Sequence, residues 1–359
     1  MAALLILLAQ SEEELRRLEA ERISAKKPLT ESESAAYMRP AVPRPQRPLR
    51  SRSLAVVSLS FTDVASADVS ELFLRDVREY YAKSSGGIFT LVGKSYGTVP
   101  LGCVREDLAK VSLRSADERA RLSAAIEAWM RRDGVGVLAA HDAVAFVPGG
   151  RLGPKDSALW PHEGTLEMAE GTLRYVVVPA DAGAHALGIA AHEFGHLLGL
   201  GDKYEAGPWC LMAMGYAETP PAPLCAPCRV KLGWWGAAKW DPGVERMMRM
   251  EDGDVVRLPA TPDGRERLLL ELRGSKMLVW HEGGGKDIEL VTVLPTGISD
   301  RLTPFSAPPF LGRGAGAREV WLTDLRAENG RATFVVGPTA PLTPAEEIRR
   351  SRVGKTLGK

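Results

Sequence analysis

The stretch that decides the fold reads His192-Glu193-Phe194-Gly195-His196-Leu197-Leu198-Gly199-Leu200-Gly201-Asp202. On a helix, residues four positions apart lie on the same face, so the rings of His192 and His196 can bind one ion from one side. Imidazole nitrogen suits zinc, and two histidines provide half of a tetrahedral ligand set. Glu193 lies about 100° further round the helix. Its carboxylate can there reach a water molecule beside the ion and serve as a general base.

Gly199 and Asp202 extend the pattern past the helix. Glycine tolerates the positive φ that ends a helix, so the chain can turn back at Gly199 and offer Asp202 as a third ligand. Glu205, also acidic, is the alternative third ligand. Three protein ligands leave one zinc position open, which is typical of a catalytic site. The competing interpretation is a buried amphipathic helix with two hydrogen-bonded histidines, but chance produces the five-residue pattern in roughly one such chain in a hundred.

Composition limits the possible partners. The 359 residues are 45% hydrophobic and 25% charged, and the formal net charge is +1. These values are ordinary for a globular protein of one or two domains. They give no reason to expect nucleic acid or an anionic membrane as a partner.

The N-terminal run Met1–Ala9 is apolar but too short to span a bilayer. It can be the end of a signal peptide's apolar core, although it lacks the positive n-region. The alternative is a plain apolar terminus.

The sequence divides into four segments. Residues 1–50 are a signal remnant or disordered leader that ends in a proline-arginine linker, which cannot fold as a helix. A propeptide or a plain disordered tail would show the same pattern. Residues 51–238 form an α/β (α+β) catalytic domain with a twisted mixed sheet, a backing helix and the active-site helix. Residues 239–338 hold short apolar runs separated by turn residues, the pattern of a small β-sandwich. Residues 339–359 are a basic tail.

Apolar patterning predicts the elements of the catalytic domain. Helices are expected from Asp68 to Lys83, closed by Gly86 and Gly87, and from Ser115 to Arg132. Strands are expected at Leu54–Phe61, Ile88–Val92, Ala143–Val147 and Tyr175–Val178.

The zinc-binding pattern resembles the metzincin signature, with Asp in place of the third His. Among families that share the Asp, the immune inhibitor A family of secreted zinc metalloproteases is most similar to this chain. Snapalysin-type proteases share only the short motif. The segments that carry the wider resemblance are Arg78–Gly87, Leu159–His162, Lys231–Trp234, Leu270–Arg273 and Leu278–His281.

The resemblance implies a metzincin-like domain and a secreted, monomeric zinc endopeptidase that acts on proteins or peptides. It implies a methionine turn under the metal, for which Met212 fits the family's Trp-x-x-Met form. In the other register, Met214-Gly215-Tyr216, Tyr216 becomes a candidate donor to the oxyanion. The family often binds calcium, but no dense aspartate loop in this sequence supports a calcium site.

In this interpretation zinc is held by His192, His196 and Asp202. Glu193 takes a proton from the attacking water and passes it to the leaving amine. Two alternatives stay open: a zinc hydrolase of a non-protein amide, and a degenerate relative that serves as a binding or structural module. The intact Glu193 argues against the degenerate relative.

Four cysteines raise the question of disulfides: Cys103, Cys210, Cys225 and Cys228. Cys225 and Cys228 form a single Cys-x-x-Cys, and a zinc ribbon needs two. A bridge from Cys210 to Cys225 or Cys228 would stabilise the active-site floor by roughly 3 kcal/mol. The family resemblance favours Cys210–Cys225, because similar members show Cys-Leu-Met followed by Leu-Cys-Ala. Cys103 would then be free or paired with Cys228.

Overall fold

The computed structural model describes residues 48–65, 70–112, 141–168, 171–234, 238–239, 246–259, 267–283, 286–295 and 321–337. Most of the expected leader, the expected helix from Ser115 to Arg132, the predicted capping residue Asp68 and the basic tail lie outside these residues. In the part of the chain that is described, no helix is long and apolar enough to cross a membrane.

The N-terminal half is built on a five-stranded sheet in the order β2-β1-β3-β5-β4. Its strands are β1 (Ser51–Ser60), β2 (Thr90–Pro100), β3 (Ala143–Pro148), β4 (His162–Met168) and β5 (Gly171–Val177). Four strands run parallel, and the edge strand β4 pairs antiparallel with β5. The expected mixed α/β sheet is confirmed.

The internal strand β1 shows that the sheet is covered on both faces. Its alternate residues enter two different buried clusters, Leu54 and Val56 in one and Ala55 and Val57 in the other. A strand buried on both faces reads as a continuous apolar run, as this one does.

Strand β2 continues well beyond the expected end at Val92, because Gly93 makes room for a helix above it. A Cβ atom at Gly93 would lie 2.3 Å from the Leu74 side chain. Glycine within a strand often marks such a close approach.

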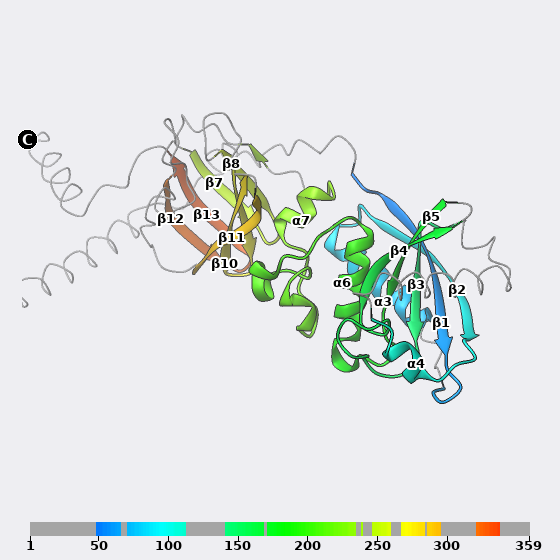
Figure 1. The fold of residues 1–359 in the computed structure, drawn as a ribbon. Helices are drawn as coiled ribbons and strands as arrows, with labels where there is room; N and C mark the ends of the chain where they lie inside the picture. The colour runs from blue at the N-terminus through cyan, green and yellow to red at the C-terminus, as the bar shows by residue number, and fades with distance from the viewer. Residues whose placement is uncertain are drawn as a thin grey trace, which may run out of the picture.

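Two helices cover one face of the sheet, α3 (Ser70–Ser84) and α6 (Ala186–Leu197) (Figure 1). Tyr81 of α3 packs edge-on against Phe194 of α6, with ring centroids 5.0 Å apart. The Tyr81 hydroxyl also donates to the Ala191 carbonyl oxygen at 2.7 Å. Helix α6 is therefore fixed to α3 by both packing and a buried hydrogen bond.

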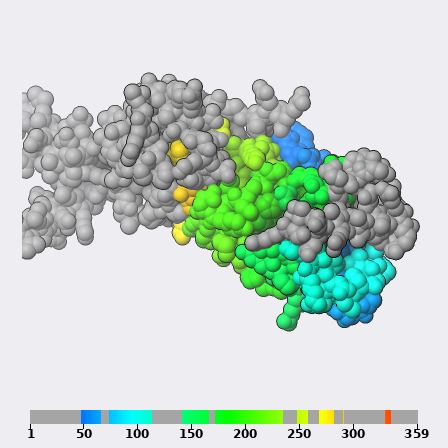
Figure 2. All heavy atoms as spheres, in the orientation of Figure 1, coloured from blue at the N-terminus to red at the C-terminus, as the bar shows by residue number. Residues whose placement is uncertain are grey.

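Short helical segments complete this half of the molecule. They are α4 (Arg105–Ala109), η2 (Gly183–His185), η3 (Tyr204–Trp209), η4 (Met214–Ala217) and α7 (Ala226–Lys231). In the space-filling view the green residues, which include η2, η3, η4 and α7, lie between the cyan N-terminal part and the yellow residues of the later sheets (Figure 2).

The described residues after 237 form strands and the turns between them, arranged in two sheets. The first has the order β11-β10-β9-β8-β6 and the second β12-β13-β7. The strands are β6 (Ala238–Lys239), β7 (Arg246–Glu251), β8 (Val255–Pro259), β9 (Arg267–Arg273), β10 (Lys276–Gly283), β11 (Lys286–Pro295), β12 (Trp321–Glu328) and β13 (Arg331–Gly337). In Figure 1 the labelled strands of these sheets gather at the left and the N-terminal sheet lies at the right, with α7 between them.

The two halves share one hydrophobic core. Leu269, Leu278 and Trp280 of the later sheets belong to the same buried cluster as Phe194 of α6. The domain boundary expected near residue 238 therefore stays a prediction, because no gap in packing marks it among the described residues.

Buried charged side chains also connect the later sheets to the first half of the chain. Glu271 of β9 is fully buried and accepts hydrogen bonds from the Ala226 backbone N–H and the Trp280 indole, both at 2.9 Å. Its other oxygen accepts from Arg229 at 2.5 Å and from Arg273 at 2.8 Å. The carboxylate thus connects β9 and β10 to the start of α7.

Candidate metal centre

Helix α6 brings the two histidines together as the four-residue spacing predicts. The Nε2 atoms of His192 and His196 lie 3.2 Å apart, and the ring centroids lie 4.8 Å apart. The helix is buried around them because Ala191 and Phe194 pack into the core. Both Nε2 atoms therefore converge on a single point beside the helix.

The helix ends at a glycine turn that returns the chain to this point. Gly199 has φ of +89°, and the N–H of Leu200 donates to the Gly195 carbonyl oxygen at 3.1 Å. This is the hydrogen-bond pattern of a helix closed by a left-handed glycine. Asp202 then places Oδ1 3.2 Å from His192 Nε2 and 3.5 Å from His196 Nε2.

Asp202, rather than Glu205, completes the group of donor atoms among the described residues. The side chain of Glu205 is exposed. The structure thus brings together the three side chains that the sequence predicts as ligands, and their metal-binding role stays a prediction.

The geometry of the donor atoms fits zinc. The Nδ1 atoms of His192 and His196 donate to the carbonyl oxygens of Leu211 and Leu200, each at 2.9 Å. These hydrogen bonds leave both Nε2 atoms as lone-pair donors. Tetrahedral ligands at zinc–nitrogen and zinc–oxygen distances lie about 3.3 Å apart. The observed separations of 3.2 to 3.5 Å match that value.

Glu193 lies beside the donor group without belonging to it. Its side chain is buried, and burial raises the pKa of its carboxyl to about 7, although His192 acts in the opposite direction. Asp202 and Glu163 add to the rise through their negative charges. A cation held by the neighbouring histidines would lower this pKa again.

The contacts between His192 and Asp202 also shift the pKa values of both side chains. Burial opposes a charge on His192, but hydrogen bonds with Asp202 and the Leu211 carbonyl raise the pKa of its imidazole. The hydrogen bond with His192 in turn lowers the pKa of Asp202 against the effect of burial. Asp202 also has a hydrogen bond with Tyr204, which acts in the same direction.

The segment expected to form the methionine turn packs against α6, and burial favours Met212 over Met214 for that position. Met212 is fully buried, whereas Met214 is 48% exposed. A Cβ atom at Gly195 would lie 2.5 Å from Met212 Sδ, so the missing side chain of Gly195 lets the thioether approach the helix. The Lys203 N–H donates to the Met212 carbonyl oxygen at 2.6 Å and holds the turn against the ligand loop.

Tyr216 lies beside the first ligand. Its ring centroid is 5.2 Å from that of His192, in an edge-to-face arrangement. Gly188 of α6 permits this approach, because a Cβ atom there would lie 1.8 Å from the Tyr216 carbonyl oxygen. Its expected role as a donor to the oxyanion stays a prediction.

Two residues near the site were not identified from the sequence. Tyr204 contacts Asp202, and only its position two residues after the ligand could have indicated this. Arg174 of β5 donates to the carbonyl oxygens of His196 and Leu197 at 2.8 and 2.7 Å. A cation at the carboxyl end of a helix is a stabilising arrangement. Arg174 also pairs with Glu163 of the adjacent strand at 3.0 Å.

The expected disulfide between Cys210 and Cys225 is not formed. The described cysteines are all free thiols. Instead, the sulfur atoms of Cys210, Cys225 and Cys228 all lie within 4.8 Å of one another. Cys228 Sγ is 3.8 Å from Cys210 Sγ and 3.5 Å from Cys225 Sγ, so the fold gathers three thiols rather than one pair. Cys103 packs beside a different cluster and does not pair with Cys228.

No protein-family model and no curated protein matches the chain. Among solved structures it is similar to archaemetzincin from Methanopyrus kandleri, at 16% identity over 52% of this chain and 96% of that one, with a TM-score of 0.31. It is also similar to metalloproteinase-II from Bacteroides fragilis, at 13% identity over 52% of this chain and 54% of that one, with a TM-score of 0.33. Neither description names the immune inhibitor A family, so that resemblance stays a prediction. The proposals below depend on the geometry of the site itself.

Proposed function

We propose that the chain is a secreted zinc-dependent endopeptidase whose zinc ligands are His192, His196 and Asp202. The observation that carries the proposal is the convergence of their three donor atoms, 3.2 to 3.5 Å apart, next to the buried carboxyl group of Glu193. Three ligands leave one coordination position for water or substrate, as catalytic sites do.

The residues of the chain divide the chemistry between them. A bound zinc ion supplies a water of lowered pKa and polarises the carbonyl that it contacts. Glu193 accepts the proton of the attacking water and then donates it to the nitrogen of the leaving amine. Tyr216, beside His192, is placed to donate a hydrogen bond to the oxygen that becomes negative. Leu200 and Leu211 hold the two imidazoles in the tautomer that binds metal.

The position of the edge strand β4 is an argument for a peptide as the substrate. It is the last strand of its sheet, so its outer edge pairs with no other strand among the described residues. It also packs against α6, the helix that carries Glu193. An extended peptide can add to such an edge through main-chain hydrogen bonds. Recognition through the main chain suits an enzyme that cleaves within a polypeptide.

The test is a pair of carboxyl-to-amide variants in the full chain. Glu193→Gln should reduce the hydrolysis of casein or gelatin by 10²-fold or more, the order that a general base contributes. It should leave the zinc content unchanged, because Glu193 is outside the donor group. Glu205→Gln removes a nearby exposed carboxylate and should behave like the unmodified protein.

Three outcomes separate the possible functions. Hydrolysis that disappears with a chelator and with Glu193→Gln supports the peptidase. Zinc at the site without cleavage of any protein contradicts the peptidase and leaves a hydrolase of a non-protein amide or a binding module. Full activity in Glu193→Gln contradicts the proposed mechanism. Secretion is tested separately, by locating the protein in the medium or in the cells of its native host.

A further inference from the structure

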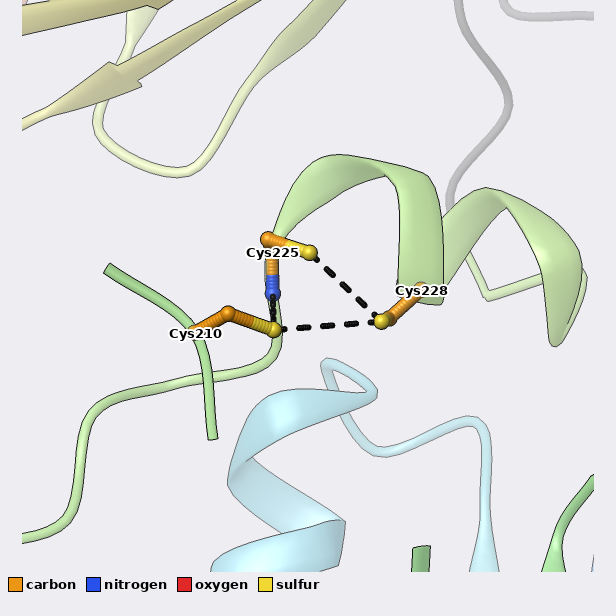
Figure 3. A group of neighbouring side chains, drawn as sticks. All are labelled: Cys210, Cys225 and Cys228. Atoms are coloured by element: carbon orange, nitrogen blue, oxygen red, sulfur yellow. Dashed lines mark hydrogen bonds between the residues drawn. The ribbon is translucent and has the colours of Figure 1, made fainter. Parts of the chain in front are cut away.

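The three gathered thiols stand apart from the catalytic group and have no role in the proposed reaction. Cys210 lies at the end of η3, Cys225 immediately precedes α7, and Cys228 is in its first turn. Figure 3 shows the three sulfur atoms pointing toward one another from these two segments. All three residues are at most 2% exposed.

The spacing of the sulfur atoms matches that of ligands around one metal ion. Thiolates bind zinc at about 2.3 Å, so two of them in a tetrahedron lie about 3.8 Å apart. The observed separations are 3.8 Å for Cys210 and Cys228 and 3.5 Å for Cys225 and Cys228. A disulfide needs sulfur atoms about 2.0 Å apart and joins only two of the three.

The surroundings also suit a negatively charged metal-thiolate group. The largely buried guanidinium group of Arg273 donates to the carbonyl oxygens of Trp209 and Leu224, at 2.9 and 2.8 Å. These are the residues directly before Cys210 and Cys225. One cation from β9 therefore holds both cysteine-bearing segments in place.

Positive charge lies near the sulfur atoms, from Lys203 as well as from Arg273. Arg229 and Arg273 with Glu271 carry a net charge of one positive, and all three side chains are buried or nearly so. A divalent ion with three thiolates carries one negative charge. Buried charges are tolerated when they are compensated in this way.

We propose that Cys210, Cys225 and Cys228 bind a second zinc ion, separate from the catalytic one. On binding, each thiol releases its proton to solvent and forms a sulfur–zinc bond, and a small exogenous donor such as water fills the fourth position. Zinc is the soft divalent ion that thiolates commonly select without redox chemistry.

The second ion has a structural role under the catalytic centre. The Cys210 carbonyl oxygen accepts the N–H groups of Ala213 and Gly215, at 3.0 and 3.1 Å, and so closes the turn that presents Met212. Bound metal would tie this turn to α7, and α7 is already fixed to β9 through Glu271. The site joins the floor of the catalytic centre to the later sheets.

The first experiment counts metal in the full chain, purified under reducing conditions without chelator. The unmodified protein should hold about two zinc ions per chain by elemental analysis. Cys228→Ser and His192→Ala should each hold about one, and the double variant should hold none. Cys103→Ser is the matched control, since Cys103 is outside the cluster, and it should keep both ions.

The second experiment identifies the ligands with cobalt in place of zinc. Sulfur-to-cobalt charge-transfer absorption should be present in the unmodified protein and in His192→Ala. It should be lost in Cys228→Ser. Because His192→Ala leaves all three cysteines intact, it provides a test even if Cys228→Ser fails to fold.

The two proposals fail in different ways. The second site would be overturned if the unmodified protein held only one zinc ion and Cys228→Ser kept it. Absence of the charge-transfer band from His192→Ala, or a disulfide mapped within the cluster, would also overturn it. None of these results would affect the proposed catalytic residues. Full activity in Glu193→Gln would overturn the catalytic proposal instead, and it would leave the count of two ions unchanged, because Glu193 is outside both donor groups.

Discussion

At the scale of single residues, the two histidines are oriented by backbone carbonyls rather than by carboxylates. Each donates Nδ1–H to a leucine carbonyl at 2.9 Å, so the metal-binding tautomer is set by the fold. The acceptor for His192 is Leu211, which directly precedes Met212. The methionine turn therefore orients the first ligand as well as packing under the helix. Such partners of metal ligands contribute to metal affinity.

Asp202 is the residue whose role is most directly testable. Asp202→Ala leaves two protein ligands, so we expect zinc affinity at the catalytic centre to fall by at least tenfold. Glu205→Ala should leave it unchanged, because the Glu205 side chain is exposed and outside the donor group. The measurement is competitive titration of each purified variant with a zinc chelator. The reverse result, with Glu205→Ala losing the metal, would show that Glu205 is the third ligand.

At the scale of elements, local pattern predicted the histidine-bearing helix α6, but it failed where partners are distant in sequence. The period of the histidines, Gly199 and the apolar residues around Phe194 together indicated α6 and its end. Strand β4 was not predicted, because it is an edge strand with exposed polar residues such as Glu163 and Thr165. The cysteine cluster depends on the path of the 15-residue excursion from Cys210 to Cys225, which no periodicity encodes.

The contact between α6 and η4 gives an element-scale prediction. A Cβ atom at Gly188 would lie 1.8 Å from the Tyr216 carbonyl oxygen, and backbone cannot move aside as a flexible side chain can. Gly188→Ala should therefore destabilise the protein by about 1–3 kcal/mol or more and reduce activity by displacing Tyr216. Differential scanning calorimetry and a peptidase assay measure the two effects.

Gly201→Ala is the control for this substitution. Gly201 follows the same helix, and nothing lies within 4 Å of the position that its Cβ atom would take. It should change the melting temperature little. Equal melting temperatures for the two variants would mean that η4 does not pack on α6 as closely as described.

At the scale of the whole molecule, the later sheets support the catalytic centre as well as adding to the core. Glu271 and Arg273 of β9 reach the backbone of Ala226, Trp209 and Leu224, which belong to the segments around the methionine turn and α7. The sequence pattern marked Leu270–Arg273 as a shared segment, but its partners lie about 45 residues or more earlier in the chain. Only the folded structure shows that Glu271 and Arg273 bind the backbone of these distant segments.

Substitution of Glu271 tests this coupling. Glu271→Gln keeps the shape of the side chain but leaves two buried guanidinium groups, on Arg229 and Arg273, without their anion. Removing one partner of a buried charge cluster costs about 3–5 kcal/mol. Glu106→Gln is the control, since the Glu106–Lys110 pair is exposed on α4 and such pairs contribute about 0–1 kcal/mol. Urea unfolding followed by tryptophan fluorescence gives both free energies of unfolding.

We expect Glu271→Gln also to weaken zinc binding at the catalytic centre, because the segment that carries Leu211 and Met212 loses its anchor. A loss no larger than that of Glu106→Gln would show that the later sheets do not stabilise the centre through this carboxylate.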